Sequence, residues 1–494
     1  MMTGNKKIGN DQDKKEALDL KSNQLTASKE NISEWYNQLM FLADILDDRY
    51  DVKGMAVWKP YGYRMMLNIK AVWDKLFQEQ GIEEVYFPLI VPIEYCEQNA
   101  SWWEGFKSEG FKVIAGTENK IQGVIRPTGE PAIYPMYSKW VRTKSDLPIR
   151  FYETVNSYRY ETKSTRPLIR TREITVWHEI HTAHATKEEA EKEFKLHQEL
   201  YDKLWEHLAL PPFKVRKPIW ECFPGAIGAI EYYTTTPSGR VMENGSVNNL
   251  GQAYAKKFNI KFKDEQGKEQ YAWQLCTGNG ARLLGGAFLV HGDNKGLIIP
   301  PKIAPIQVVI APILFKGKEK PVLDKSREIF EELKDKIRVK LDERENKSAG
   351  EKFYEWEIKG VPLRIEIGPK DLEEKKAVIV RRDNSTKEKV EFSQIKKRVK
   401  EVLDEIHSNL LKKATDMLQS QLKQANTFEE IKTNLKAGKI SSVFWCNDEK
   451  CYEKIAKIEE GLEGFGTDPI EKEEGTCVVC KKKTKTKLYI AKSY

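Results

Sequence analysis

The sequence has no apolar run long enough to cross a membrane. A spanning helix needs about 18 consecutive apolar residues, and none of the 494 residues begins such a run. The first 24 residues are polar and charged, without the apolar core of about 7 to 15 residues of a secretory signal. These absences predict a cytoplasmic protein without a membrane partner.

Cysteine is scarce, with 7 residues in the chain, and it is unevenly distributed. Cys96, Cys222 and Cys276 are isolated, and isolated cysteines in the cytoplasm are expected to remain reduced. The other four form a C-x4-C pair and a C-x2-C pair beside short polar turns near the C-terminus. Two such pairs predict a structural Zn²⁺ site, with free or disulfide-bonded cysteines as the alternative. The ligands would be Cys446, Cys451, Cys477 and Cys480.

Positive charge exceeds negative charge only slightly. Lys and Arg number 82 against 74 Asp and Glu, which gives a net charge of +8. This excess does not identify a nucleic-acid partner by itself, but it permits an anionic ligand on a local basic surface. The length, with 40% hydrophobic residues, predicts two to four domains, in keeping with typical domain sizes.

The segment 151–184 predicts two strands joined by a long charged loop. Because side chains alternate along a strand, its second strand is expected to show one polar and one apolar face. The polar face would carry Glu173, Thr175, Trp177, Glu179 and His181, and the other face Ile174, Val176 and Ile180. The loop gathers guanidinium groups, which suit phosphate oxygens. Its charged residues are Arg159, Glu161, Lys163, Arg166, Arg170 and Arg172.

Three patterns in this segment resemble a known family. N-x-x-R-Y-E, R-P-L-I-R-T-R-E and W-H-E-I-H-T-A-H are similar to motif 2 and the amino-acid pocket of prolyl-tRNA synthetases of the archaeal and eukaryotic type. A helix and a Pro-bearing strand over 58–92 resemble motif 1, the homodimer interface of that family. Arg282, before a Gly-rich apolar helix, resembles motif 3. The interval 184–278 contains no counterpart of the editing domain carried by the bacterial form.

The resemblance implies an α+β class II catalytic core, an antiparallel sheet with flanking helices, over residues 31–303 after a mobile segment 1–30. From 304 to 410 strand-like and helical runs alternate, which predicts an α/β domain. This part resembles the family's anticodon-binding domain, with Lys352, Arg381 and Arg382 as candidate tRNA contacts. Residues 411–494 are expected to form a small zinc-binding α+β domain. The family ends in a tyrosine whose carboxylate approaches the active site, which suggests the same for Tyr494.

The resemblance also implies the reaction. Proline would be activated by ATP with Mg²⁺ to prolyl-adenylate, with release of pyrophosphate, and transferred to the 3′ end of tRNA(Pro). Arg159 would bridge the α-phosphate and the proline carboxylate, Arg170 would reach the γ-phosphate, and Arg282 would stack under the adenine. Glu161 would orient the adenine or a motif 2 arginine. Proline would contact Thr128, Glu130, Arg159, Trp177, Glu179, His181 and Phe223.

Three positions around the nucleotide depart from the family pattern. Glu243, Ser246 and Asn248 stand where the family commonly has Gln, Thr and His. Serine still offers a hydroxyl, and asparagine replaces one imidazole hydrogen bond. Glu243 adds a negative charge near the phosphates.

Three other readings remain open at this stage. The chain fits another class II synthetase of the threonyl, glycyl or histidyl type, or a non-catalytic synthetase-like tRNA-binding protein. A third reading makes His178, His181 and His184 the metal ligands of a hydrolase. Strand alternation opposes the third, because it places His178 on the face opposite His181, and H-E-I-H is one residue shorter than H-E-x-x-H.

Overall fold

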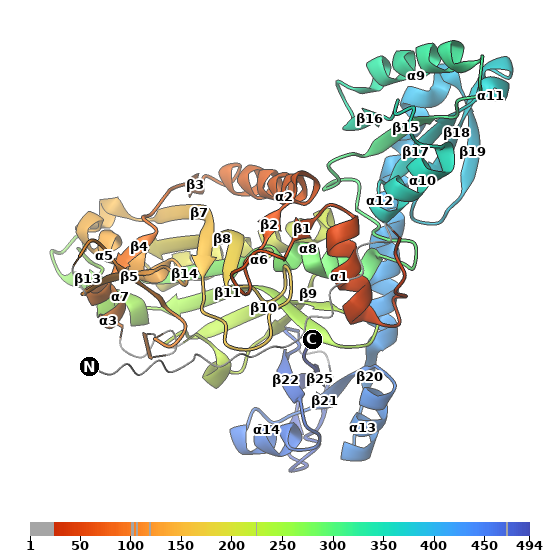
Figure 1. Cartoon of the computed structure of the whole chain (residues 1–494). Helices are drawn as coiled ribbons and strands as arrows, with labels where there is room; N and C mark the ends of the chain where they lie inside the picture. Colours follow the sequence, from red (N-terminus) through yellow and green to blue (C-terminus); the bar gives the residue numbers. More distant parts are fainter. Residues whose placement is uncertain (1–23, 100–102, 105–106, 118–119, 224, 471–472) are drawn as a thin grey trace, which may run out of the picture.

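A long twisted sheet organises the structure, a computed structural model that describes residues 24–99, 103–104, 107–117, 120–223, 225–470 and 473–494 (Figure 1). Within these residues its 11 strands run in the order β20–β21–β25–β22–β9–β10–β11–β14–β8–β7–β3. The bounds, in that order, are Leu422–Gln424, Ile440–Phe444, Lys487–Lys492, Leu462–Thr467, Phe213–Arg216, Gly228–Thr235, Val241–Gly251, Trp273–Asn279, Glu173–His184, Ile149–Tyr158 and Glu83–Glu84.

The middle of this sheet, from β9 to β7, is antiparallel and is covered on both faces by helices. Helices α2 (Pro60–Gln78), α6 (Lys187–His207) and α8 (Arg282–His291) bury their apolar sides in one core with Ile180 and Val247. Helices α5 (Glu130–Trp140) and α7 (Ala253–Phe258) pack on the opposite face, in a second core with Ala183 and Cys276. An antiparallel sheet with flanking helices is the predicted core fold.

The predicted helix after residue 58 is α2, and the predicted strand after it is divided into two. Only β3 and β4 (Ile90–Pro92) are extended there, and β4 belongs to a small sheet with β5 (Phe111–Ile114) and β6 (Ile121–Ile125). Helix α6 begins with a capping box, in which the Thr186 hydroxyl accepts from Glu189 N and the Glu189 carboxylate accepts from Thr186 N.

Strand β8 alternates as predicted only in its second half. Residues Thr175 and Val176 together oppose Asn156 of β7, a β-bulge that shifts the register. Val176 adopts a left-handed backbone with φ of +55°, which is rare for a β-branched residue. The extra residue turns Ile174 to the same side as Trp177, and both line one cavity. The predicted grouping of Glu173 and Thr175 with Trp177 is therefore wrong.

Residues 24–30 are packed against the body of the protein, contrary to the predicted mobile segment; residues 1–23 of that segment lie outside the described part. Leu25 and Ala27 contact the first core. The Gln38 carboxamide oxygen accepts from the Thr26 and Ala27 amides at 3.0 and 3.1 Å. Pairing of these amides explains how a polar segment is held without a long apolar stretch.

A separate five-stranded sheet, in the order β16–β15–β17–β18–β19, follows the core (Figure 1). The strands are Val339–Leu341, Val308–Pro312, Leu363–Ile367, Lys376–Arg381 and Lys387–Glu391, with α9 (Glu319–Leu333), α10 (Ala349–Ile358) and α11 (Pro369–Glu373) around them. Helix α12 (Ile395–Gln421) leaves this domain and reaches the C-terminal module of α13 (Phe428–Lys436), α14 (Glu449–Ala456) and strands β20–β25. The boundary predicted at residue 410 therefore falls inside one continuous helix.

The three predicted tRNA contacts of the five-stranded domain serve its fold instead. Lys352 is 1% exposed, and its ammonium donates to Asp342 O at 3.1 Å. Arg382 is 6% exposed and makes two hydrogen bonds to the Asp293 carboxylate, at 2.8 and 2.6 Å. The Asp383 carboxylate accepts two hydrogen bonds from Arg381 in the same way. Because these cations are committed within the chain, we correct their assignment as tRNA contacts.

The Arg382–Asp293 pair joins the five-stranded domain to the core and predicts a stability effect. Replacing Arg382 with Leu removes three hydrogen bonds, two to the Asp293 carboxylate and one to Glu357 O, so the free energy of unfolding is expected to fall by about 1 to 3 kcal/mol. Thermal and urea unfolding of Arg382→Leu measure this. The control Lys400→Ala, at an exposed position of α12, is expected to change stability by no more than about 0.5 kcal/mol. Unchanged stability together with weakened tRNA binding would restore the tRNA role.

Candidate active site

A cavity of about 830 Å³ opens where the β7–β8 loop, β11, β14, the start of α8 and the last residues of the chain meet. It brings together two arginines that are 123 positions apart, Arg159 and Arg282 (282 − 159). Seven of the predicted proline- and ATP-binding residues line it: Arg159, Glu161, Arg170, Trp177, Glu243, Ser246 and Arg282.

Arg159 and Arg282 are oriented by backbone carbonyl groups. Arg159 Nε donates to Pro127 O at 3.1 Å, and its guanidinium lies 5.7 Å from the centre of the Trp177 ring. Arg282 donates from Nε to Ile169 O at 3.0 Å and from Nη1 to Glu243 O at 2.9 Å. Burial and the positive charge of Arg282 lower the pKa of the Arg159 guanidinium. Such mutual repulsion of two cations is relieved by an anion in the cavity.

The other loop residues lie nearer to solvent. Arg170 Nε is 3.7 Å from the Glu161 carboxylate, and 42% of the Arg170 side chain is exposed. Glu161 also accepts a hydrogen bond from Lys163 N at 3.1 Å. Glu161 is thus close to Arg170, and its suggested role in orienting the adenine or the motif 2 arginine stays a prediction.

Behind this cavity, three adjacent strands place His181, Cys276 and Asn248 side by side. The register pairs His181 of β8 with Cys276 of β14, and Cys276 with Asn248 of β11. All three side chains are buried. The Asn248 amide donates to Ser246 Oγ at 3.0 Å, which ties this row to the next one along the sheet, where Ser246 lines the cavity.

A buried carboxylate pair stands over this row. Glu130 and Glu179 are 3% and 1% exposed. Thr128 Oγ1 donates to the Glu130 carboxylate at 2.6 Å, and Glu179 Oε2 accepts from Gly129 N and from His181 Nε2, both at 3.1 Å. Helix α5, which begins at Glu130, packs on the face of the sheet that carries Ala183 of β8.

The pKa values of this group are pushed apart. Burial raises the pKa of Glu130, and the attraction of His181 offsets this only in part. Burial acts in the same direction on Glu179, but the hydrogen bonds from His181 and Gly129 prevail, and the pKa of Glu179 falls below its usual value. Burial opposes the charge of His181, yet the contact with Glu179 raises its pKa. Glu179 is therefore ionised and Glu130 is the carboxyl with more affinity for a proton.

Two polar atoms of this site are buried without a hydrogen-bond partner among the described residues, Glu179 Oε1 and Trp177 Nε1. Buried polar atoms are normally paired. Unpaired ones beside a cavity are available to a polar ligand.

Trp177 owes its position to two glycines that sequence reasoning did not single out, Gly278 of β14 and Gly280 directly after that strand. A Cβ atom on Gly278 would lie 2.5 Å from Trp177 Cζ2, and one on Gly280 would lie 3.2 Å from Trp177 Cε3. The indole thus lies directly over the backbone of β14. The alternation of glycine in T-G-N-G at period two was the available signal.

Sequence reasoning also missed the buried pair Arg126–Glu153. Arg126 Nη1 lies 3.3 Å from both Glu153 carboxylate oxygens and donates to Phe87 O at 2.8 Å. Burial and the negative charge of Glu179 raise the pKa of Glu153 to about 7. Because Arg126 directly precedes the turn 127–129, the pair fixes the chain where it enters that turn. A lone arginine before a proline gave no signal of burial.

Phe223 is not among the lining residues of the large cavity and packs on the second core instead. Its ring centre is 6.3 Å from that of Tyr254. The Tyr134 hydroxyl in the same core is hydrogen-bonded to His181 Nδ1 at 3.0 Å. Phe223 therefore faces the aromatic end of the site.

Tyr494 lines the large cavity through its phenol ring. Arg166 Nη1 donates to the Tyr494 hydroxyl at 2.7 Å, and the Arg166 guanidinium lies 5.2 Å from the ring centre. The Tyr494 amide donates to Val241 O at 2.9 Å. The contacts with Arg166 are made by the phenol of Tyr494. The approach of the Tyr494 carboxylate to the active site, which the resemblance suggests, stays a prediction.

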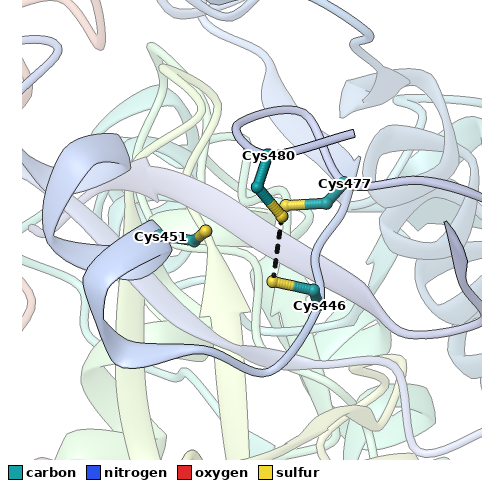
Figure 2. A group of neighbouring side chains, drawn as sticks. All are labelled: Cys446, Cys451, Cys477 and Cys480. Atoms are coloured by element: carbon teal, nitrogen blue, oxygen red, sulfur yellow. Dashed lines mark hydrogen bonds between the residues drawn. The ribbon is translucent and has the colours of Figure 1, made fainter. Parts of the chain in front are cut away.

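The four C-terminal cysteines converge (Figure 2). Their sulfur atoms all lie within 4.8 Å of one another, and Cys480 Sγ is 3.6 Å from Cys446 Sγ. A tetrahedral zinc with bonds of about 2.3 Å would hold sulfurs about 3.8 Å apart, so the spacing fits that metal. The cysteines are free thiols rather than disulfides. Among the described residues this is the one group of three or more candidate ligands that converges.

The positions of the three histidines contradict the interpretation of the chain as a metal-dependent hydrolase. His178 is stacked between Trp73 and Phe77, with ring centres at 4.3 and 4.9 Å, on the face of the sheet opposite His181. Burial lowers its pKa well below the usual value. The described residues contain no histidine cluster with metal-ligand spacing.

An antiparallel sheet, an arginine-lined cavity and a second arginine at the start of a helix define a class II aminoacyl-tRNA synthetase. The chain matches the models for the tRNA synthetase class II core domain (G, H, P, S and T) over residues 111–290, the anticodon binding domain over 307–402 and the prolyl-tRNA synthetase C-terminal domain over 428–494. By these matches and the relatives below, the chain belongs to the prolyl-tRNA synthetase family.

Its relatives match along nearly the whole length. The proline--tRNA ligases of Thermococcus kodakarensis and Methanococcoides burtonii are 42% and 41% identical, over 94% of this chain and 98% of theirs. The Giardia lamblia prolyl-tRNA synthetase in complex with prolyl-adenylate has a TM-score of 0.92 at 33% identity, covering 95% of this chain and 99% of that one. The Cryptosporidium parvum enzyme, complexed with halofuginone and AMPPNP, has a TM-score of 0.90 at 31% identity, covering 96% and 100%.

The contact between Trp177 and Gly278 predicts a sensitive position. In Gly278→Ala the new methyl group would meet the indole at 2.5 Å, so Trp177 has to leave its place over β14. The rate of proline-dependent pyrophosphate exchange is expected to fall by about 10-fold or more, as for small misplacements in active sites. Gly350→Ala is the control, because nothing lies within 4 Å of its added Cβ. Wild-type exchange by Gly278→Ala would show that the indole position is unimportant.

Proposed function

We propose that the large cavity binds ATP with its phosphates between Arg159 and Arg282, and that proline occupies the hollow between Trp177 and His181. The observation that carries this proposal is the convergence of both arginines on one cavity beside a buried carboxylate. The proline carboxylate attacks the α-phosphorus of ATP, the bond to pyrophosphate breaks, and prolyl-adenylate results. A ribose hydroxyl of tRNA(Pro) then takes the prolyl group, and AMP leaves.

The proposed roles follow from position. Arg159 lies over Trp177 and can therefore reach the proline carboxylate and the α-phosphate together. Arg282 is held against Glu243 O, where the adenine would stack. Arg170, being more exposed, would meet the γ-phosphate. In phosphoryl chemistry such positioning and charge neutralisation supply most of the catalysis.

The secondary ammonium of proline has two N–H donors, and the buried carboxylates supply acceptors. Glu179 Oε1 has no partner within the described residues, and the Glu130 carboxylate lies beside it with Thr128. Trp177, His181 and Phe223 would contact the apolar ring. Since one missing methylene is worth only about 1 to 3 kcal/mol, alanine and cysteine are expected to be activated slowly.

Of the three departures from the family pattern, Glu243 and Ser246 line the cavity proposed for ATP, and Asn248 lies next to Ser246. Ser246 is hydrogen-bonded to Asn248, so these two would act as a pair. Glu243 and Glu161 are the carboxylates among the described lining residues. Mg²⁺ enters as part of the ATP complex, and carboxylate oxygens of this kind suit it.

The remaining proposals concern tRNA(Pro), a second copy of this chain and the location of the protein. The five-stranded domain would bind the anticodon of tRNA(Pro) through surface other than the three residues corrected above. A homodimer is supported by a group of exposed apolar side chains around β4, namely Tyr86, Leu89, Ile90 and Ile114, since such patches mark interfaces. No helix in the described part of the chain is long and apolar enough to cross a bilayer, and a cytoplasmic location remains our proposal.

A structural Zn²⁺ would be held by Cys446, Cys451, Cys477 and Cys480, whose sulfur spacing fits it. Bound there, it would link the two cysteine loops of the C-terminal module and supply folding energy.

Pyrophosphate exchange with each of the twenty amino acids tests the proposed reaction. Proline is expected to give the highest kcat/KM, and Arg159→Ala is expected to lose about 2 to 4 kcal/mol of transition-state stabilisation, as for a lost oxyanion donor. Arg142→Ala, at an exposed position, should keep wild-type exchange. Faster exchange with another amino acid would identify another class II synthetase, and no exchange at all would favour the non-catalytic reading.

Metal analysis tests the zinc site. Wild type is expected to contain about one zinc per chain, and Cys446→Ser combined with Cys477→Ser is expected to lose it, because serine is a poor zinc ligand. Cys96→Ser, at a buried cysteine outside the cluster, should retain the metal. Equal metal content in all three proteins would mean that the module is held together in another way.

A further inference from the structure

The turn between β9 and β10 connects the cysteine module to the amino-acid site. It contains the short 3-10 helix Ile219–Glu221 and then Phe223. Phe223 faces Tyr254 and the second core on the side of the substrate. Trp220, three residues earlier, faces the C-terminal module instead. One short segment therefore has one aromatic side chain in each part of the molecule.

Trp220 meets two aromatic residues that flank the cysteines. Its ring is 5.8 Å from that of Trp445 and 6.0 Å from that of Tyr452, with interplanar angles of 82° and 71°. Both are edge-to-face arrangements, which are favourable for aromatic pairs. In the chain Trp445 directly precedes Cys446, and Tyr452 directly follows Cys451.

Polar contacts hold the same junction. The Tyr452 hydroxyl is hydrogen-bonded to the Glu221 carboxylate and to Gly464 O of β22. Lys217 Nζ lies 2.8 Å from the Glu221 carboxylate and 3.4 Å from that of Glu231, in β10. Glu231 pairs with Ser246 in the sheet register. The turn is thereby tied both to the cysteine module and to the strands of the active site.

The Trp445 side of the contact is fixed. Trp445 is 1% exposed, and its indole N–H donates to Asp448 O at 3.1 Å inside the C-x4-C loop. Trp220 itself is 37% exposed. Trp445 is therefore held in place within the module, and the turn packs against it through Trp220.

We propose that Trp220 is a positioning residue for the amino-acid site: the aromatic pair Trp445 and Tyr452 holds Trp220, and Trp220 holds the turn that carries Phe223 against proline. In this arrangement the cysteine module sets the affinity for the amino acid although none of its cysteines touches a substrate. The inference rests on the proposed placement of proline beside Phe223.

The experiment compares Trp220→Ala, Trp220→Phe and the matched control Ile219→Ala, which lies in the same turn with its side chain 56% exposed. In pyrophosphate exchange, Trp220→Ala is expected to raise KM for proline by about 3- to 10-fold, the size associated with a lost aromatic contact. KM for ATP, zinc content and the melting temperature should stay near wild type. Trp220→Phe should recover most of the proline affinity, and Ile219→Ala should behave as wild type.

A double-mutant cycle with Tyr452→Ala tests whether Trp220 affects the proline affinity through its contact with Tyr452. If the contact carries the effect, Trp220→Ala together with Tyr452→Ala raises KM for proline no more than the stronger single variant. Full additivity of the two effects would overturn the inference, and so would an unchanged KM in Trp220→Ala. If kcat, zinc content and melting temperature all fall together in Trp220→Ala, Trp220 has a general structural role and the inference is wrong. Best exchange of wild type with another amino acid would instead overturn the proposed proline site.

Discussion

Two like charges held at one cavity are the constraint on which the catalytic core depends. Arg159 and Arg282 are oriented by backbone carbonyls of Pro127, Ile169 and Glu243, so these contacts bring no opposite full charge. A carbonyl dipole of this kind fixes the orientation of a guanidinium without itself adding a full negative charge.

The surrounding backbone is shaped to permit this. The bulge at Val176 turns Ile174 and Trp177 toward the same cavity. Gly278 and Gly280, in and directly after β14, let the indole approach the sheet. The left-handed conformation of a β-branched residue and the loss of side chains in a central strand both oppose stability. Their concentration within one small region fits a site where geometry is selected over stability.

Much of this could be predicted from the sequence, because periodic patterns and capping signals are local. The helix α6 with its capping box, the two strands around the charged loop, and the position of Arg282 at a helix start were all recognisable. The β-bulge at Val176 could not be predicted, since no turn residue stands beside it. The sequence is equally compatible with a regular strand whose side chains alternate without interruption. Arg381 and Arg382 were misread because the sequence shows a basic pair but not the carboxylates of Asp383 and Asp293 that meet it in space. The roles of the individual site residues stay predictions.

The long sheet joins the catalytic core to the cysteine module through very little backbone. Strands β9 and β22 share a single residue pair, Arg216 with Thr467, whereas the strands on either side of this seam pair over many residues. Buried side chains cross this seam instead, with the rings of Phe213 in β9 and Phe465 in β22 at 5.9 Å in one apolar cluster. The module is therefore held to the catalytic core by side-chain packing rather than by the strand ladder, and a polar residue at Phe465 would loosen the module first.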